Sequence, residues 1–270
     1  MADDRPALLL VGCGKMGGAL LAGWLERRSV GHVTVVEPGT VDSAFRQHPD
    51  VTIHRDAGAL GTLQPAVVVF ATKPQVMDDV VPPYRRFAQS GALFMSIAAG
   101  RTLGYFEKQL GDVPIVRAMP NTPAQVGRGI TVACANRRVD GRQRALAEEL
   151  LGAVGQVGWV DDEALIDAVT AVSGSGPAYV FLLAECLAEA GRAAGLPADL
   201  ATRLARATVS GAGELLHRSP EPASTLRQNV TSPGGTTAAA LAVLMADDGM
   251  RPLLVKAVAE ATRRSRELAG

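Results

Sequence analysis

Cysteine, histidine and aromatic residues are scarce in this sequence. Its three cysteines, Cys13, Cys134 and Cys186, form neither a CxxC pair nor an even set for disulfides. We therefore expect a reducing compartment and, with acidic residues where a secretory leader would have basic ones, a cytoplasmic protein. The four histidines show no HxxxH or HExxH spacing, so the sequence predicts no metal site.

Net charge is also lacking. Basic and acidic residues number 27 each, so the composition offers no basic surface for nucleic acid. No apolar run approaches the roughly 20 residues that a membrane span needs, and we expect no membrane partner. Hydrophobic residues make up 47% of the 270 residues, enough to bury one large domain or two smaller ones.

The pattern of apolar residues in the sequence changes near residue 160. Before it, short runs rich in Val, Ile and Leu alternate with segments of helical length, which predicts a parallel, doubly wound sheet. The expected strands are 7–11, 32–36, 66–71, 92–98 and 114–119, and the helices between them include 15–28 and 102–110. Beyond it, apolar residues recur every three or four positions, which predicts helices over 161–172, 177–194, 198–217 and 234–268.

These patterns predict an α/β fold with two domains. An N-terminal Rossmann-like doubly wound sheet is expected over 1–160, followed by an all-helical C-terminal domain over 161–270. The helical half is rich in alanine, so its helices approach closely and bury little area each. We therefore expect helices of a second copy to complete it as a dimerisation domain.

A glycine-rich turn follows the first expected strand. The stretch VGCGKMGG (11–18) holds the GxGxxG pattern at Gly12, Gly14 and Gly17, directly before a helix. Such glycines allow a tight turn and let a pyrophosphate approach the amides of a helix N-terminus. The context between strand and helix predicts a dinucleotide site rather than a plain turn.

Two charged residues stand at later strand ends. Glu37 ends the second strand, where an acid commonly holds the adenosine ribose of NAD and repels the 2′-phosphate of NADP. Lys73 ends the strand before FATKPQ (70–75), which faces the ligand crevice in an open sheet. Alternatively, Glu37 is a solvated acid in a loop and Lys73 is a surface lysine in a turn.

Small residues and prolines end the next two strands, in SIAAG (96–100) and RAMPNTPAQVG (117–127). Small side chains leave room for a flat nicotinamide ring. Asn121 is expected either to contact the ligand or, slightly favoured, to pin the bend between Pro120 and Pro123.

The helical half contributes two polar patterns. Glu163 and Thr170 lie seven residues apart on one helical face and could address one ligand, although from the residues alone a helix-dipole acid and a packing residue are favoured. VTSPGGTTAAAL (230–241) predicts a helix start with Ser232 as its cap and Pro233 just inside. Its additional glycines and threonines exceed what capping requires, so either the backbone approaches another body closely or the stretch is a loop. Considered beside the glycine turn, it is a candidate carboxylate site.

No GxSxG, no Cys with a placed His and no metal cluster occurs in the sequence. That pattern is typical of an enzyme whose cofactor carries the chemistry. Taken in order, the motifs VGCGKMG, ATKPQ, SIAAG, RAMPNTP, DAVTAVSGSGPAY and VTSPGGTT resemble the pyrroline-5-carboxylate reductases, from residue 11 to about 241. SGSGPAY followed by TSPGGTT is not a general dehydrogenase pattern, and the resemblance covers nearly the whole chain.

The resemblance implies reduction of pyrroline-5-carboxylate to proline with NADP(H), with NAD(H) accepted or preferred because of Glu37. It implies catalytic roles for Glu163 and Thr170 and substrate contacts at Ser232, Gly235, Thr236 and Thr237. The implied cofactor contacts are Gly12, Cys13, Gly14, Lys15, Met16, Gly17, Glu37, Ala71, Thr72, Lys73, Pro74, Ala99 and Asn229. A dimer formed through the C-terminal helices, extended to a ring of dimers, is also implied. Glu37 departs from the family's general preference for NADPH, and Asp56 departs from the neutral amide that is usual in its neighbourhood.

Two other functions fit parts of the sequence. A β-hydroxyacid dehydrogenase-like enzyme would need a lysine acid in the helical half, where only Lys256 occurs. An NAD(P)-sensing regulatory protein would need the glycine turn but not the hydroxyl-rich TSPGGTT.

Overall fold

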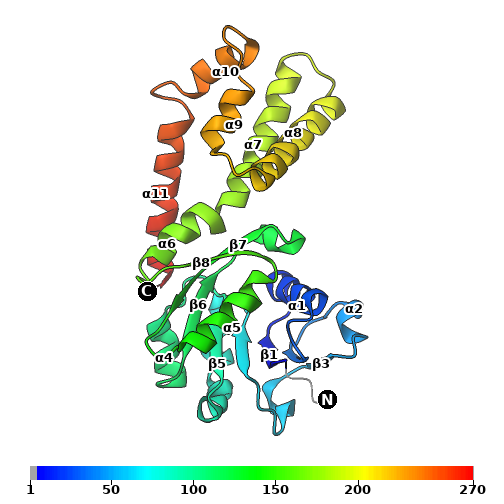
Figure 1. The fold of residues 1–270 in the computed structure, drawn as a ribbon, viewed down its shortest axis with the longest axis vertical. Helices are drawn as coiled ribbons and strands as arrows, with labels where there is room; N and C mark the ends of the chain where they lie inside the picture. Colours follow the sequence, from blue (N-terminus) through cyan, green and yellow to red (C-terminus); the bar gives the residue numbers. More distant parts are fainter. Residues whose placement is uncertain (1–4, 270) are drawn as a thin grey trace. The chain divides into compact units, whose positions relative to one another are not determined.

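The computed structural model describes residues 5–269 (Figure 1). The chain divides into two compact units, Met1–Gly174 together with Ala261–Gly270, and Ser175–Glu260. A domain boundary near residue 160 stays a prediction. The pattern of apolar residues changes there, whereas the compact units divide the chain at Gly174.

An eight-stranded sheet runs through the first unit in the order β3-β2-β1-β4-β5-β6-β7-β8. Pairing is parallel from β3 to β6, which confirms the doubly wound plan of the N-terminal half. The strands are β1 (Ala7–Val11), β2 (His32–Val36), β3 (Val51–His54), β4 (Val67–Phe70), β5 (Leu93–Ser96), β6 (Ile115–Met119), β7 (Gly129–Ala135) and β8 (Gly155–Trp159).

The sheet is mixed rather than wholly parallel, which corrects the sequence prediction. β7 pairs antiparallel with β6, and β8 then pairs parallel with β7. The connection 120–128 holds only the short 3₁₀ helix Thr122–Val126. Because a parallel partner needs a crossover of roughly a dozen residues or more, this connection returns the chain antiparallel.

Helices cover both faces of the sheet (Figure 1). Leu8 and Leu10 of β1 face one core, where α1 and α5 pack, while Leu9 and Val11 face the other, which includes α4. The Trp24 indole of α1 donates to the Leu150 carbonyl of α5 at 2.8 Å. The helices of this unit are α1 (Lys15–Arg27), α2 (Ser43–Arg46), α3 (Met77–Val80), α4 (Leu103–Leu110), α5 (Gly141–Gly152) and α6 (Leu165–Val169), with 3₁₀ helices at Ala57–Leu60, Pro74–Val76 and Pro82–Ser90 and a π-helix at Thr170–Gly174.

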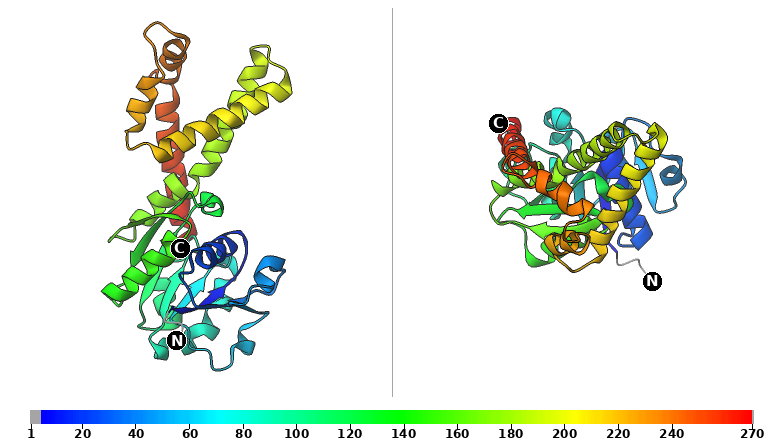
Figure 2. Two further views of the ribbon diagram at one scale, coloured as in Figure 1. Left: turned by 45° about the vertical axis from the view of Figure 1, so that its right-hand side comes forward. Right: turned by 90° about the horizontal axis from the view of Figure 1, so that it is seen from above.

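The second unit is helical, as expected. In it α7 and α8 form an antiparallel hairpin (Figure 2), joined through Gly195, whose φ of +95° only glycine adopts readily. The single helix expected over 234–268 is two helices joined by a tight turn, in which a Cβ on Gly249 would lie 2.5 Å from the Leu244 carbonyl oxygen. The helices are α7 (Gly176–Ala193), α8 (Ala198–Arg218), α9 (Ala223–Asn229), α10 (Thr236–Leu244) and α11 (Met250–Ala269), the last turns of which belong to the first unit.

The second unit has almost no core of its own. Within Ser175–Glu260 only Ala201 and Ala205 are buried, whereas Phe181 of α7 is 63% exposed and Val243 of α10 is 72% exposed. The segment Leu165–Ala193 is long and apolar enough to cross a membrane, and only 6% of its most apolar window is buried. This finding corrects the expectation that no stretch reaches that length and apolarity, and the exposed surface needs a partner of some kind.

The edge strand β8 supplies a test of the fold. Gly155 has φ +153°, and a Cβ there would collide with the backbone of Gly129 in β7, whereas a Cβ at Gly158 would make ordinary contact with Val132 at 3.7 Å. We expect Gly155→Ala to lower the free energy of unfolding by about 3 kcal/mol and Gly158→Ala to change it by less than about 1 kcal/mol. Urea unfolding of the two variants measures the difference, and equal losses would contradict the register of β7 on β8.

Candidate active site

The glycine turn between β1 and α1 is shaped by close backbone contacts. Gly12 has φ +93°, and a Cβ there would lie 2.8 Å from the Ala71 carbonyl oxygen. A Cβ at Gly17 would collide with the Gly12 carbonyl, while one at Gly14 would meet nothing within 4 Å. Gly14 is the N-cap of α1, and no side chain among the described residues caps this helix. At Gly12 and Gly17 the backbone of the turn therefore packs too closely for a side chain. At Gly14 there is open space in front of the unpaired amides of the helix, which fits a dinucleotide pyrophosphate.

A cavity of about 530 Å³ opens beside this turn. Its volume lies within the range typical of small-molecule sites. It gathers residues from the carboxyl ends of β1, β2 and β4, the crevice where open α/β sheets bind ligands. Six of the predicted cofactor residues line it: Gly12, Gly14, Glu37, Ala71, Thr72 and Lys73.

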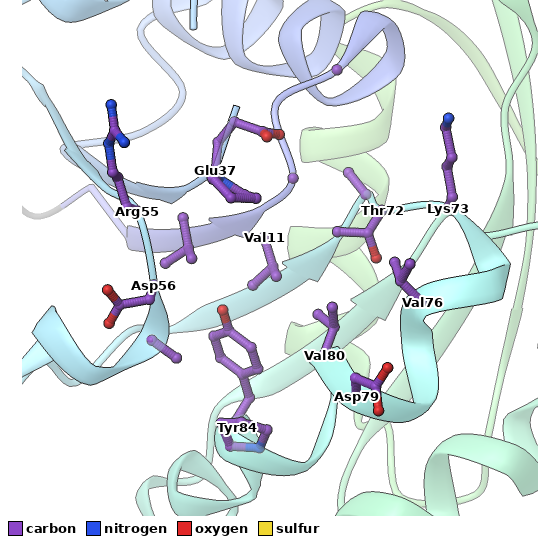
Figure 3. Close-up of a pocket in the computed structure, with 17 residues that line it drawn as sticks. Val11, Glu37, Arg55, Asp56, Thr72, Lys73, Val76, Asp79, Val80 and Tyr84 are labelled. Carbon is purple, nitrogen blue, oxygen red and sulfur yellow. The ribbon is translucent and has the colours of Figure 1, made fainter. Parts of the chain in front are cut away.

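Charged side chains stand around this cavity (Figure 3). Arg55 and Lys73 lie at opposite ends of the labelled set, and Glu37 lies between them. Asp56 also lines the cavity, and its carboxylate accepts the amide of Gly58 at 2.8 Å. Cations at both ends suit a ligand whose phosphates are spread along its length.

Glu37 holds the glycine turn itself. Its Oε2 accepts the backbone amide of Cys13 at 2.8 Å, and its Oε1 accepts the amide of Gly39 at 2.8 Å. Glu37 also lines a second hollow of about 370 Å³, together with Arg46 and with Arg55, which the two hollows share. The carboxylate is therefore a fixed part of the turn and not a solvated loop acid.

The other predicted cofactor residues do not line the cavity. Cys13, Lys15, Met16 and Gly17 belong to the turn or the start of α1, and Pro74 begins the 3₁₀ helix after β4, where its carbonyl accepts two hydrogen bonds from Arg101. Ala99 lies in the loop that follows β5. Asn229 ends α9 in the second unit, and its amide donates to Glu221 at 3.3 Å.

One wall of the cavity was missed from the sequence. Val76, Val80 and Tyr84 line it from the segment after Lys73. Burial raises the pKa of the Tyr84 phenol to about 12, so this hydroxyl stays protonated. A helical spacing could have indicated this wall from the sequence, because the three residues recur every four positions. They follow directly after Lys73, which the sequence placed at the site.

Asn121 has the structural role that the sequence slightly favoured. It is 9% exposed, and its Oδ1 accepts the amide of Ile130 at 2.9 Å. The side chain thus pins the bend that leads from β6 into β7.

Glu163 lies in the first unit, just before α6. Its Oε1 accepts a hydrogen bond from Arg117 Nη1 at 2.7 Å and another from the Leu103 amide at 2.7 Å. Its Oε2 accepts none from the described residues. Arg117 was quoted within a motif but not singled out, although an arginine inside an apolar strand demands a buried partner.

Thr170 opens the π-helix Thr170–Gly174, a distortion found often at functional sites. Its hydroxyl donates to the Ile166 carbonyl at 2.8 Å. With its hydrogen engaged, the Thr170 oxygen remains free to accept a hydrogen bond from a ligand.

The segment Ser232–Thr237 lies in the second unit, and its local geometry corrects two expectations. The N-cap of α10 is Gly235 and not Ser232, and the Gly235 amide donates to the Ser232 carbonyl at 3.0 Å. Gly235 therefore offers no free amide to a ligand. No side chain among the described residues caps α10, so the first free amides are those of Thr236, Thr237 and Ala238.

Comparison with known proteins identifies the family. A family model described as pyrroline-5-carboxylate reductase dimerisation matches residues 163–268, and one described as NADP oxidoreductase, coenzyme F420-dependent, matches residues 7–100. A pyrroline-5-carboxylate reductase of Synechocystis is 41% identical over 96% of this chain and 97% of its own length. The chain belongs to the pyrroline-5-carboxylate reductases.

Other members of the pyrroline-5-carboxylate reductases agree in sequence and fold. The relative from Pseudomonas aeruginosa is 39% identical over 98% of both chains. The solved reductase of Coxiella burnetii superposes with a TM-score of 0.91 at 36% identity, covering 99% of this chain and 100% of the other. The Plasmodium falciparum reductase, solved with NADP bound, has a TM-score of 0.82 at 28% identity and 99% coverage of both. The exposed apolar helices of the second unit thus fall in the dimerisation domain of the family, which gives them a partner other than a membrane.

The Cys13 thiol reports on the charge of Glu37. Burial, followed by the carboxylates of Glu37 and Asp42, raises the pKa of this thiol to about 11. At pH 8 about one thiol in a thousand is then ionised, so we expect slow alkylation by iodoacetamide. Glu37→Gln removes one of the anions, lowers the pKa and should speed alkylation several-fold.

Peptide mass spectrometry in a Cys186→Ser background, which removes the exposed thiol, measures the rate at Cys13. Glu26→Gln on α1 is the matched control and should leave the rate unchanged. Equal rates with and without the Glu37 charge would contradict this account of the turn.

Proposed function

We propose that this protein reduces 1-pyrroline-5-carboxylate to L-proline, the last step of proline biosynthesis, with NAD(P)H. The observation that carries the proposal is the 41% identity to a pyrroline-5-carboxylate reductase over nearly the full length of both chains. The cavity beside the glycine turn supports it, because its strand-end residues fit a dinucleotide.

When bound, the nicotinamide supplies a hydride to the carbon of the C=N bond. If the ring nitrogen arrives protonated, the addition gives the amine directly, and this chain needs no strong general acid. The absence of histidine from the motifs agrees with that requirement. What the protein must supply is acceptors that hold a positively charged N–H group.

Glu163 and Thr170 offer such acceptors. Glu163 keeps Oε2 free after Arg117 and Leu103 have bonded to Oε1. Thr170 has given its hydrogen to Ile166 and can only accept. We propose that these two oxygens receive the N–H of the protonated imine and stabilise its charge.

The substrate carboxylate needs donors, and we propose the start of α10 for them. The amides of Thr236 and Thr237, with the hydroxyls of Ser232 and Thr237, would meet the anion at a helix N-terminus, each such term contributing roughly 0.3–1 kcal/mol. Gly235 contributes by its shape, because it lets the turn from Ser232 close on itself.

Glu37 bears on the choice of cofactor. A carboxylate at the end of β2 accepts the ribose hydroxyls of NADH and repels the 2′-phosphate of NADPH. Arg55, which lines the same cavity, and Arg46, in the adjoining hollow, offset part of that repulsion. We propose that the protein uses both cofactors and that Glu37 favours NADH.

For the assembly we propose a homodimer paired through α7, α8, α10 and α11, with dimers joined in a larger ring. The support is the exposed apolar surface of these helices and their place in the dimerisation domain. We further propose a cytoplasmic location, since the three cysteines are unpaired.

The decisive experiment follows cofactor oxidation with pyrroline-5-carboxylate, using NADH and NADPH separately. We expect turnover with both cofactors and formation of L-proline in amounts equal to the cofactor consumed. The absence of turnover with either cofactor, in protein shown by circular dichroism and light scattering to be folded and assembled, would overturn the proposal.

The contribution of Glu37 can be isolated by Glu37→Ser. This change removes the charge beside the ribose and leaves Arg46 and Arg55 in place, so kcat/KM for NADPH relative to NADH should rise about tenfold or more, or roughly 1.4 kcal/mol. Asp79→Ser, on the opposite wall of the cavity, is the control and should leave the ratio within twofold. An unchanged ratio in Glu37→Ser would show that the carboxylate does not select the cofactor.

A further inference from the structure

Arg117 is the one charged side chain of the described β6 strand, and it is almost wholly enclosed. The residue is 4% exposed. It lies opposite Ser96 of β5 on one side and opposite Cys134 of β7 on the other, in the interior of the sheet. A guanidinium in such a place requires an ion-pair partner, since an unpaired buried charge is strongly destabilising.

Glu163 is that partner, and it does more than neutralise a charge. One carboxylate oxygen, Oε1, accepts hydrogen bonds from Arg117 Nη1 and from the backbone amide of Leu103, each at 2.7 Å. The carboxylate itself is 26% exposed against 5% for the arginine side chain. The pair therefore joins a buried strand to a carboxylate that still reaches a surface, with Oε2 unused by the described residues.

The Leu103 amide connects this pair to the loop after β5. Leu103 is the first residue of α4, and Thr102 before it caps the helix by accepting the Tyr105 amide at 3.1 Å. At the other end of the loop, Ser96 accepts the amide of Ala98. The loop 97–102, which carries Ala99, is thus held at one end by Ser96 and at the other by Thr102 and Glu163.

We propose that Arg117 is a positioning residue of the reductase. It holds the Glu163 carboxylate with Oε1 turned inward and Oε2 outward, and through the Leu103 amide it sets the end of the loop that carries Ala99. This inference rests on the proposed function, in which Oε2 receives the substrate N–H, and on the cofactor contact that the family resemblance implies for Ala99. The guanidinium acts only through Glu163 and touches neither substrate nor cofactor.

The geometry explains why an arginine serves here. Its charge sits at the end of a long side chain that leaves from a central strand, so its donor reaches Glu163 while the strand keeps its backbone pairing. Lysine would keep the charge but lose the planar fork that orients a carboxylate. Methionine would keep the packing and lose both charge and donor, leaving Glu163 free to rotate about the Leu103 amide.

Kinetics of Arg117 variants test the proposal in the full-length protein. For Arg117→Met we expect kcat to fall at least tenfold, while the Kd for NADPH, from fluorescence titration, stays within threefold because the cavity beside the glycine turn is unchanged. Arg117→Lys should recover part of the loss. Glu163→Gln and Arg117→Met should be non-additive, the double variant losing no more than about twofold beyond the worse single variant.

Arg138→Met is the matched control. Arg138 forms an ion pair with Asp112 just after β7, at the edge of the sheet opposite the strand ends that line the cavity, and its loss should leave kcat within twofold. If Arg117→Met does not fold, Arg117→Lys alone must show the fall in kcat with unchanged cofactor affinity. A kcat within twofold of wild type in the folded Arg117 variants, or fully additive effects with Glu163→Gln, would overturn the inference. A wild-type enzyme without turnover would instead overturn the proposed function.

Discussion

The buried charge of Arg117 constrains how the chain ends its first unit. The Arg117 side chain is buried against one face of the sheet, so its guanidinium needs an anion from an element packed on that face. Glu163 supplies it only if the chain folds back over the strand ends after β8. The Cys134 thiol, 3.9 Å from the Asp161 carbonyl, lies along the same return.

That return explains why the first unit continues beyond the last strand to Gly174. After Glu163, Asp167 of α6 accepts a hydrogen bond from Ser265 at 2.7 Å, which brings the last turns of α11 into the same compact unit. The Leu268 carbonyl oxygen lies so near Gly100 that a Cβ there would be 3.0 Å away. The loop after β5 is therefore bordered by residues from two distant parts of the chain, Glu163 and Leu268.

The second unit follows a different rule. With two buried alanines and exposed Phe181 and Val243, the described helices of Ser175–Glu260 leave much of their apolar surface exposed to water. The family's dimerisation domain covers these helices, and in such a domain a second copy supplies the missing burial. The same surface explains how a segment of a dimeric enzyme can have the length and composition of a membrane span.

Features fixed by local chemistry were predictable from the sequence. The glycine turn and five strands of the sheet depend on residue types at short spacing, and the structure has them where the sequence indicated. The edge strands β3 and β8 were missed because short or glycine-containing strands carry little hydrophobic pattern. β7 and its direction depend on the length of one connection, and the role of Arg117 depends on a partner 46 residues away.

Similar reasoning applies to the turn before α10. The residues of TSPGGTT predicted the start of a helix. Which backbone amide remains free for a ligand depends on the hydrogen bonds within the turn. A hydrogen bond from Gly235 to Ser232 decides this, and it moves the available donors one residue later than the sequence suggested. The residue types therefore locate the helix start, and the backbone geometry determines which amides can donate to a ligand.

Glu37 shows how one side chain can serve two requirements. Its carboxylate closes the glycine turn by accepting the Cys13 amide, and it stands where the ribose of a dinucleotide is recognised. A neutral residue at this position would remove the repulsion of a 2′-phosphate but would also give up the strongest kind of acceptor for that amide. Under the role proposed for Glu37, cofactor choice and the geometry of the turn depend on the same carboxylate.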